Sequence, residues 1–402
     1  MANSETGVKA KHPVVDFSDT EIAFAGKNNS ELKLTAWLFR FMNKHWLVQT
    51  ASSFGLWLNK ANINIFNPII RQTFFKQFCG GISLEDSSEA IAHLMENNTH
   101  TVLDYGAEGK TEDDEFDQTL EENIKAIRFA SSSSSVPMIS SKVTALGAEA
   151  LLEKYQTGAT LNSEESIALE KIRQRVHQLC QAANDHGISI FIDAEDSWIQ
   201  APIDEMTANV MEQFNRQKAV VYKTYQMYRK DKLRELHADH KAAVEKGYIL
   251  GAKIVRGAYM EKERKRAEEM NYPSPIHDTK ADTDRDFNKA ITYCLENYQE
   301  IATCNATHNL FSNQFFAEMI VEKGLSKKHP HLYFCQLYGM SDNITFNLAA
   351  AGFNVAKILP YGPVRDVIPY LIRRARENTS VTGEMSRELS LIVTEMRRRG
   401  IK

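Results

Sequence analysis

Charged side chains stand at the ends of several short apolar runs in this sequence. Lys142 and Asp193 each close such a run, and Lys253 and Arg256 lie within and directly behind a third. A charge costs free energy to bury unless it has a partner, so each of these groups, taken alone, is more often a structural ion pair than part of a site. Their shared position favours a common site for an anionic or electron-accepting ligand.

Two adjacent arginines near the C-terminus form a second candidate. Arg373 and Arg374 lie on one predicted helix, and Glu377 follows Arg373 by four residues on the same face. As an exposed pair, Arg373 and Glu377 would stabilise the helix by only about 0.2–0.5 kcal/mol. Adjacent guanidinium groups can instead hold a carboxylate through paired hydrogen bonds, so a carboxylate clamp is the functional alternative.

The elements that must position these groups alternate from residue 100 onward. Eight β-branched apolar runs are separated by stretches of helical period, among them 163–183, 231–246 and 286–297, and a helix over 363–378 follows the last run. This alternation predicts a parallel sheet, and eight repeats predict a closed (β/α)8 TIM-type barrel, whose chemistry lies at the carboxyl ends of the strands. An open doubly wound sheet is the alternative, although no glycine-rich first turn supports it. The predicted strands are 101–105, 136–143, 189–193, 219–222, 249–255, 301–305, 332–336 and 354–358.

Helical patterns also flank the predicted barrel. Residues 1–99 predict an N-terminal helical arm, residues 100–380 the catalytic barrel, and residues 381–402 a helical tail. An acidic stretch over 110–122 and five serines over 131–135 are interpreted as a solvated helix face followed by a flexible turn. The predicted helices of the arm are 32–46, 53–65 and 85–97, with a break at Gly80-Gly81.

Composition narrows the class of protein. Of the 402 residues, 43% are apolar and 25% are charged, which excludes a disordered chain. The net charge of −4 gives no reason to expect a nucleic-acid partner. The five cysteines are odd in number and form no C-x-x-C pair, so we expect reduced thiols and no metal site. No apolar run is long enough to span a membrane, and the acidic N-terminal stretch resembles no targeting signal; we expect a cytoplasmic protein, with peripheral contact at the inner membrane left open.

Five motifs, in this order, resemble the monofunctional, FAD-dependent proline dehydrogenase family over about residues 100–380. Any one of them is weak, but together they are specific. They are the turn 192–195 (IDAE), the run 253–259 (KIVRGAY), the segment 306–309 (ATHN), the segment 336–340 (QLYGM), and the pair 360–363 (PYGP) and 370–374 (YLIRR).

The resemblance implies a reaction and roles for individual residues. Members of this family oxidise L-proline to Δ1-pyrroline-5-carboxylate on a (β/α)8 barrel, pass a hydride to the flavin N5 of FAD, and then pass electrons to a membrane quinone. By this resemblance Asp193 and Lys253 are catalytic. The implied substrate-binding residues are Lys142, Tyr259, Leu337, Ile358, Arg373, Arg374 and Glu377. The implied cofactor-binding residues are Gln226, Lys253, Val255, Arg256, Gly257, Thr279, Lys280, Thr307 and His308.

One position departs from the family pattern. Ile358 stands two residues before Pro360, where the family usually has a tyrosine that packs against the proline ring and that its hydroxyproline-oxidising relatives lack. A 4-hydroxyproline dehydrogenase with the same chemistry therefore remains an alternative. A methylenetetrahydrofolate reductase-like flavoenzyme and a non-enzymatic barrel scaffold are the alternatives from other classes.

Overall fold

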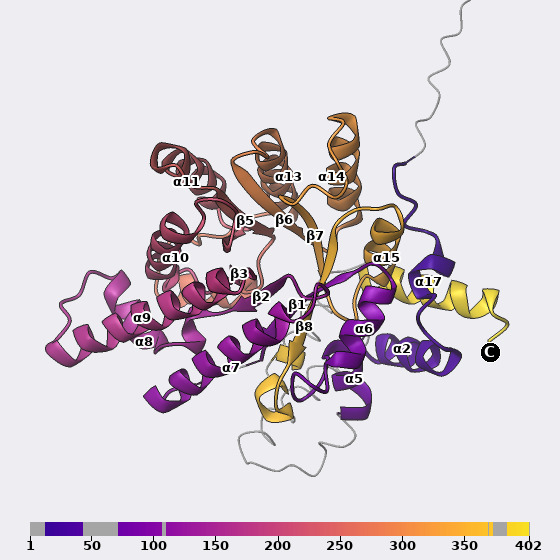
Figure 1. Ribbon diagram of the computed structural model, residues 1–402, viewed down its shortest axis with the longest axis horizontal. Helices are drawn as coiled ribbons and strands as arrows, with labels where there is room; N and C mark the ends of the chain where they lie inside the picture. Colours follow the sequence, from indigo (N-terminus) through magenta and orange to yellow (C-terminus); the bar gives the residue numbers. More distant parts are fainter. Residues whose placement is uncertain (1–12, 43–70, 107–109, 369, 373–383, 402) are drawn as a thin grey trace, which may run out of the picture.

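Eight parallel strands close into a barrel, and helices cover its outer surface (Figure 1). The structure is a computed structural model that describes residues 13–42, 71–106, 110–368, 370–372 and 384–401. Each strand pairs with the next along the chain, and the last pairs with the first. The predicted (β/α)8 barrel is confirmed, and the open sheet is wrong. The strands are β1 (His100–Tyr105), β2 (Met138–Ser141), β3 (Ser189–Ile192), β4 (Val221–Gln226), β5 (Leu250–Val255), β6 (Ile301–Ala306), β7 (Leu332–Leu337) and β8 (Val355–Tyr361).

The fourth strand continues to Gln226, beyond the predicted end at residue 222. The prediction stopped there because Lys223 interrupts the apolar pattern. In the structure the Lys223 ammonium group donates hydrogen bonds to Glu235 (2.6 Å) and Asp239 (2.8 Å) on the following helix. Since this buried charge is paired, the strand tolerates it, and Gln226 reaches the edge of the barrel where the site is expected.

Apolar side chains fill the inside of the barrel because alternate residues of each strand point inward. Phe191, Tyr222 and Cys304 belong to this inner cluster, and a second, larger cluster packs between the strands and the surrounding helices. The same alternation sends Asp193 and Lys253 inward above Phe191. All five cysteines are buried free thiols, as predicted.

Helices follow most of the strands in the predicted places. The helix predicted from residue 286 begins earlier, at Lys280, because the Thr279 hydroxyl caps it by accepting a hydrogen bond from the Asp282 N–H (3.1 Å). Every helix in the described ranges is too short or too polar to cross a membrane. The helices of the barrel are α7 (Asp113–Ser131), α8 (Glu149–Gln156), α9 (Ser163–Asp185), α10 (Gln200–Phe214), α11 (Lys232–Lys246), α12 (Met260–Glu269), α13 (Lys280–Glu296), α14 (Leu310–Glu322) and α15 (Asp342–Ala350), with a 3-10 turn η2 (Val143–Ala145).

The acidic stretch forms the start of α7 and is more than a solvated face. Asp113 and Asp117 accept hydrogen bonds from the guanidinium group of Arg175, at 2.5 and 2.7 Å. Arg175 is buried on α9, so the hydrogen bonds to these two carboxylates connect α7 with α9. The serine run ends α7 at Ser131 and continues into a turn, as predicted.

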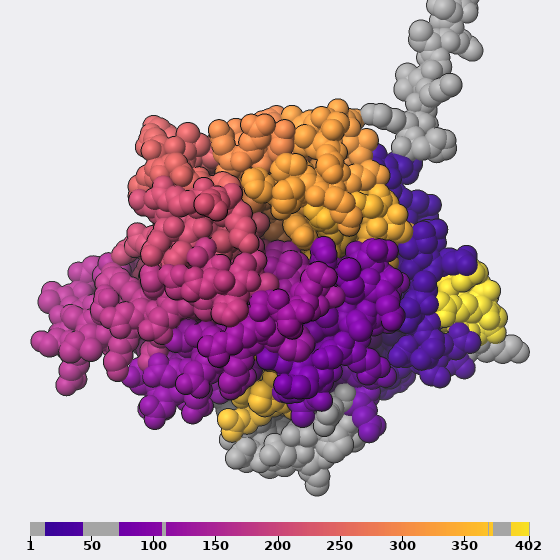
Figure 2. Space-filling view, in the orientation of Figure 1, coloured from indigo at the N-terminus to yellow at the C-terminus, as the bar shows by residue number. Residues whose placement is uncertain are grey.

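The N-terminal arm and the C-terminal helix pack against each other beside β8. Their apolar side chains share one core cluster with Val367 and Leu371, which follow β8. Arg399 donates hydrogen bonds to the carbonyl oxygens of Phe24 (2.7 Å) and Lys27 (2.6 Å), and Figure 2 shows the indigo and yellow segments side by side. The elements are α1 (Thr20–Phe24), α2 (Asn29–Met42), η1 (Arg71–Phe75), α5 (Lys76–Phe78), α6 (Ser88–Glu96) and α17 (Glu384–Arg398).

Some predicted elements are only partly described. The helix predicted over 363–378 is present at 364–368 and 370–372, and its remainder lies outside the described residues. The helix predicted over 53–65 lies outside them altogether. The division of the chain into arm, barrel and tail stays a prediction.

A glycine inside the barrel offers a test of this packing. A Cβ atom at Gly251 would lie 2.2 Å from the Val221 carbonyl oxygen on the neighbouring strand. Because backbone cannot move aside as a side chain can, Gly251→Ala should destabilise the fold by about 3 kcal/mol. Thermal unfolding measures the loss.

The matched control is Gly324→Ala. Gly324 has a positive φ of 66° but nothing within 4 Å of its Cβ position, so only backbone strain of about 1 kcal/mol is expected. Equal shifts in the two variants would contradict the packing argument.

Candidate active site

The carboxyl ends of the strands bring the predicted site residues to one mouth of the barrel. Ser141 pairs with Ile192, so the next residues, Lys142 and Asp193, leave neighbouring strands at the same level. Across the mouth, Leu337 pairs with Ile358. The described members of the predicted set lie at the ends of β2 to β8 or at the start of α13: Lys142, Asp193, Gln226, Lys253, Val255, Arg256, Gly257, Tyr259, Thr279, Lys280, Thr307, His308, Leu337 and Ile358.

An ion pair occupies the floor of this mouth. The Lys253 Nζ donates to Asp193 Oδ1 at 2.5 Å and lies 5.1 Å from the centre of the Phe191 ring. The Lys253 side chain is 4% exposed and that of Asp193 is 20% exposed. Burial acts to lower the pKa of Lys253, but the Asp193 charge and hydrogen bond outweigh it and the pKa is raised. The ammonium group therefore stays charged at neutral pH.

A second cation lies beside the end of β5. The Arg256 guanidinium donates to Asp284 (2.7 Å), Thr307 (2.6 Å) and Ser312 (3.0 Å), and its central carbon lies 4.3 Å from the centre of the Phe287 ring. A guanidinium group has five N–H donors, so donors remain for an anionic ligand. Arginine is well suited to phosphate groups.

The N-terminus of α13 adjoins this cation. Lys280 donates to Asp284 at 2.6 Å, so Asp284 bridges Lys280 and Arg256. The two cations hold the pKa of Asp284 below its usual range, despite its partial burial. Thr279, the capping residue, starts the same helix. The arrangement places hydroxyl and cationic donors where a diphosphate could bind.

The turn after β5 needs glycine at position 257. Gly257 has φ of 131°, and a Cβ atom there would lie 2.5 Å from the Tyr228 ring. The next residue, Ala258, donates its N–H to Gln226 Oε1 at 3.4 Å. Tyr259 then directly precedes α12. This turn brings backbone close to the barrel mouth.

His308 is held from the neighbouring strand. Its Nδ1 lies 2.9 Å from the Ser341 hydroxyl, and its Nε2 accepts the Leu337 N–H at 3.5 Å. Because Nε2 accepts, the neutral ring carries its proton on Nδ1. The ring is therefore fixed in orientation and tautomer by β7 and the loop behind it.

Glu195 is a buried carboxylate that the sequence prediction left without a role. It accepts hydrogen bonds from the Thr144 N–H (3.0 Å) and hydroxyl, and its backbone oxygen accepts one from Gln226 Nε2 (2.7 Å). Burial raises the pKa of Glu195 to about 7, against the opposing charge of Lys142. Glu195 thus ties together the ends of β2, β3 and β4. Its place in the motif 192–195 is the feature of the sequence that could have identified Glu195 as a residue of the site.

Three predicted residues lie outside the described residues. They are the carboxylate clamp, Arg373, Arg374 and Glu377. The described start of their helix, residues 364–368, follows β8 at the same end of the barrel. The roles given to all these residues stay predictions.

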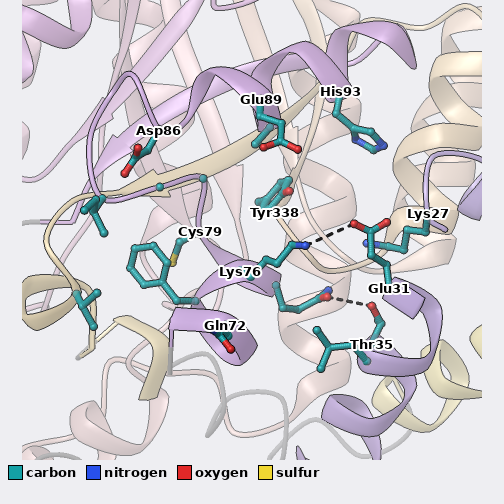
Figure 3. A pocket seen from close by; sticks show the side chains of 18 of the residues that line it. Lys27, Glu31, Thr35, Gln72, Lys76, Cys79, Asp86, Glu89, His93 and Tyr338 are labelled. Carbon is teal, nitrogen blue, oxygen red and sulfur yellow. Dashed lines mark hydrogen bonds and ion pairs between the residues drawn. The ribbon is translucent and has the colours of Figure 1, made fainter. Parts of the chain in front are cut away.

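A cavity of about 1100 Å³ lies beside the mouth rather than within it. It is bounded by α2, α5 and α6 and by the segment after β8. Figure 3 shows the Tyr338 side chain among residues of the arm, with Lys76 paired to Glu31 (3.7 Å). The described residues that line this cavity include neither Lys253 nor Asp193, nor any other residue of the predicted site.

The fold and the charged mouth define a (β/α)8-barrel enzyme. The family profile described as "Proline dehydrogenase" matches residues 87–387. The chain belongs to the proline dehydrogenase family. It is 31% identical over 374 residues to "Proline dehydrogenase 2, mitochondrial" of Arabidopsis thaliana, covering 82% of this chain and 79% of that protein. It is 33% identical over 322 residues to "Carbapenem antibiotics biosynthesis protein CarD" of Pectobacterium carotovorum subsp. carotovorum, covering 80% and 83%.

Solved structures share the fold. A proline utilization A (PutA) from Bdellovibrio bacteriovorus, inactivated by N-propargylglycine, aligns with a TM-score of 0.69 at 19% identity and covers 92% of this chain. A PutA mutant from Bradyrhizobium japonicum aligns with a TM-score of 0.64 at 20% identity and covers 77%. The chain spans 37% and 31% of the lengths of those two proteins, and the likeness at this identity shows the fold alone.

The ion pair in the mouth gives a stability prediction. Lys253→Met leaves the Asp193 carboxylate without its partner, which should cost about 3 kcal/mol at pH 7. The cost should shrink in the double variant with Asp193→Asn, which has no unpaired carboxylate. Since the pKa of Lys253 is raised, its contribution to stability should be fully present at neutral pH and should be lost only as the pH rises above its unfolded pKa of about 10.4.

Chemical denaturation at pH 7 and above pH 10 measures these effects. The control is Lys125→Met, which removes an ammonium group that is 55% exposed and paired with Glu122, and it should change stability by less than about 1 kcal/mol. An equal loss of stability at pH 7 in both single variants would contradict the buried pairing.

Proposed function

We propose that this chain catalyses the FAD-dependent oxidation of L-proline to Δ1-pyrroline-5-carboxylate in proline catabolism, with electrons passed on to a membrane quinone. The observation that carries the proposal is the buried Lys253–Asp193 pair at the mouth of a barrel whose sequence matches the proline dehydrogenase family. Contact with a quinone implies a peripheral approach to a membrane surface from the cytoplasmic side.

The residues at the mouth fit FAD. Donors remain on Arg256, and Lys280 and Thr307 lie within one network around it, which suits a diphosphate. The Thr224 hydroxyl, beside Lys253 on the adjacent strand, is buried without a hydrogen-bond partner among the described residues. FAD, when bound, supplies the hydride acceptor. The residues proposed to hold it are Gln226, Lys253, Val255, Arg256, Gly257, Thr279, Lys280, Thr307 and His308.

The chain's own groups bind and orient the substrate. Lys142, with Arg373 and Arg374, holds the proline carboxylate, and Glu377 supports the arginines. Asp193 lies near the substrate and the flavin as a catalytic carboxylate. The ammonium group of Lys253 favours negative charge that develops beside it during hydride transfer. Side chains that enclose the proline ring and exclude water are Tyr259, Leu337 and Ile358.

A 4-hydroxyproline dehydrogenase is the second candidate, and Ile358 is the observation that favours it. Ile358 is buried within the inner apolar cluster and pairs in register with Leu337. It leaves aliphatic surface where the family pattern has an aromatic ring. Membership of the proline dehydrogenase family argues against the methylenetetrahydrofolate reductase-like enzyme and the scaffold.

Anaerobic reduction of the flavin tests the proposal. The purified, FAD-loaded protein is mixed with L-proline or with trans-4-hydroxy-L-proline, and bleaching of the flavin absorbance is followed. Reduction by proline supports the main proposal, and a clear preference for hydroxyproline supports the second. Reduction by neither substrate would overturn both.

Loss of the carboxylate-binding cations should raise KM. Lys142→Met and Arg374→Met each remove one charged contact to the substrate, a loss of about 2–5 kcal/mol and so roughly 30-fold or more in kcat/KM. FAD content should not change, because neither side chain is proposed to touch FAD. Steady-state kinetics and flavin absorbance are measured on each variant, with Lys125→Met as the exposed control. An unchanged KM in both variants would contradict the proposed role of these cations in binding the substrate carboxylate.

Position 358 should control substrate selectivity. Ile358→Tyr restores an aromatic wall and leaves less room for a ring hydroxyl, so kcat/KM should shift towards proline. The shift is expected to be on the order of tenfold and at most about 100-fold, since apolar pockets reject an added hydroxyl weakly. The ratio of kcat/KM for the two substrates is measured in parent and variant. A ratio that does not move makes Ile358 a packing residue only.

A further inference from the structure

The loop between β7 and α15, residues 338–341, is contacted by segments from both ends of the chain. We call it the β7–α15 loop. It follows Leu337, which is proposed to line the proline ring, and it ends at Ser341, whose hydroxyl lies 2.9 Å from His308 Nδ1. Whatever fixes this loop also fixes two side chains of the barrel mouth.

The arm holds the loop at Gly339. Gln77 Nε2 donates to the Gly339 carbonyl oxygen at 2.8 Å, and Gln77 Oε1 accepts the Thr35 hydroxyl at 3.1 Å. Gly339 has φ of 75°, and a Cβ atom there would lie 2.0 Å from the Gln77 carbonyl oxygen. The arm and the loop are therefore in direct backbone contact, which only glycine permits.

A buried lysine holds the loop from the barrel side. The Lys357 side chain is 1% exposed, and its ammonium group donates to the carbonyl oxygens of Leu337 (3.3 Å) and Met340 and to Asp342 Oδ1 (3.0 Å). Lys27 of the arm lies 3.5 Å from the other oxygen of Asp342. Against its burial, these two cations hold the pKa of Asp342 at about 2.

The C-terminal helix holds the loop at Ser341. Glu388 Oε1 on α17 accepts the Ser341 N–H at 2.6 Å. Ser341 has φ of 52°, a left-handed conformation that residues other than glycine rarely adopt. Two hydrogen bonds stabilise that conformation: the Ser341 N–H donates to Glu388 Oε1, and the Ser341 hydroxyl is bonded to His308 Nδ1.

We propose that Glu388 is a positioning residue, which acts through Ser341 to fix the ring of His308 towards the bound cofactor, while Gln77 fixes the same loop from the arm. Both residues lie outside the family match over 87–387, so the two ends of this chain complete a site that the family region carries. The inference rests on the proposed function, because His308 is expected to contact FAD.

The charge state of Glu388 supplies a distinctive readout. Burial and the neighbouring charge of Asp342 raise the pKa of Glu388 to about 8, and Lys357, the Ser341 N–H and Arg387 oppose the rise. The uncharged form therefore prevails at pH 7. As the pH rises through the folded pKa, a second anion forms beside Asp342 and faces Lys357, Arg387 and, through Ser341, His308. Because a carboxylate accepts a hydrogen bond from an N–H group more strongly than a neutral acid does, the contact with Ser341 should then tighten.

Two substitutions at Glu388 separate these effects. Glu388→Gln keeps an acceptor for the Ser341 N–H and cannot ionise, whereas Glu388→Ala removes the acceptor. Ser390→Ala, at an exposed position on the same helix, is the matched control. Ser341→Ala keeps the backbone hydrogen bond and removes only the hydroxyl that contacts His308, so it tests the link if Glu388→Ala does not fold.

The first measurement needs no cofactor. Amide hydrogen exchange over residues 337–341 of the apoprotein should be about tenfold faster in Glu388→Ala, as the loss of one hydrogen bond predicts, and unchanged in Glu388→Gln and Ser390→Ala at pH 7. After correction for the base-catalysed rise of the intrinsic exchange rate, the protection of the Ser341 amide should increase between pH 7 and pH 9 in the wild type and stay constant in Glu388→Gln. Equal exchange in Glu388→Ala and wild type would overturn the proposal.

The second measurement concerns His308 and the flavin. Glu388→Ala and Ser341→Ala should each weaken FAD binding by roughly threefold to tenfold and shift the His308 Nδ1 resonance, while Glu388→Gln restores both values at pH 7. Unchanged FAD affinity and an unchanged resonance in both variants would overturn the link to His308. If wild-type protein binds FAD but proline does not reduce it, the proposed function fails, and the exchange and resonance measurements still decide the role of Glu388.

Discussion

The pairing of Lys253 with Asp193 is the constraint on which the site depends. Two charges inside a barrel are tolerated only when each neutralises the other and finds hydrogen-bond partners. Strand alternation sends both side chains inward, and the Phe191 ring below them closes the floor. The pair therefore sets the depth of the site. A ligand can enter down to this level, where it meets a fixed positive charge and a partly exposed carboxylate.

Two separate hydrogen-bond networks surround this pair, and each one involves different strands of the barrel. The cations at the end of β5 and the start of α13 form one network through Asp284, on the side where a diphosphate is proposed. The ends of β2 to β4 are tied by Glu195, which contacts the turn after Lys142 and the amide of Gln226. Each network leaves its central side chain oriented before any ligand arrives, which lowers the entropy lost on binding.

The sequence predicted the strands and helices well, but it predicted contacts between residues that are far apart in the chain poorly. Eight strands could be recognised because β-branched runs recur between helical stretches, and the site residues could be placed because strand ends share one edge of a barrel. The end of β4 was missed because the pairing of Lys223 with Glu235 and Asp239 joins a strand to the next helix. No local pattern could reveal that Ser341 contacts Glu388, since the two are 47 residues apart, or that Gln77 contacts Gly339, 262 residues away.

The joint packing of the arm and α17 bears on how the protein acquires its shape during synthesis. The arm is synthesised before the eight strands, whereas Arg399, which donates to the carbonyl oxygens of Phe24 and Lys27, is synthesised after them. Contacts of such long sequence separation form late, because the loop that joins them must first be closed. A nascent chain can build strand after strand, but the supports that α17 gives to the proposed cofactor pocket can form only after all eight strands have been synthesised. Binding of a cofactor at this pocket is therefore expected to follow the synthesis of α17.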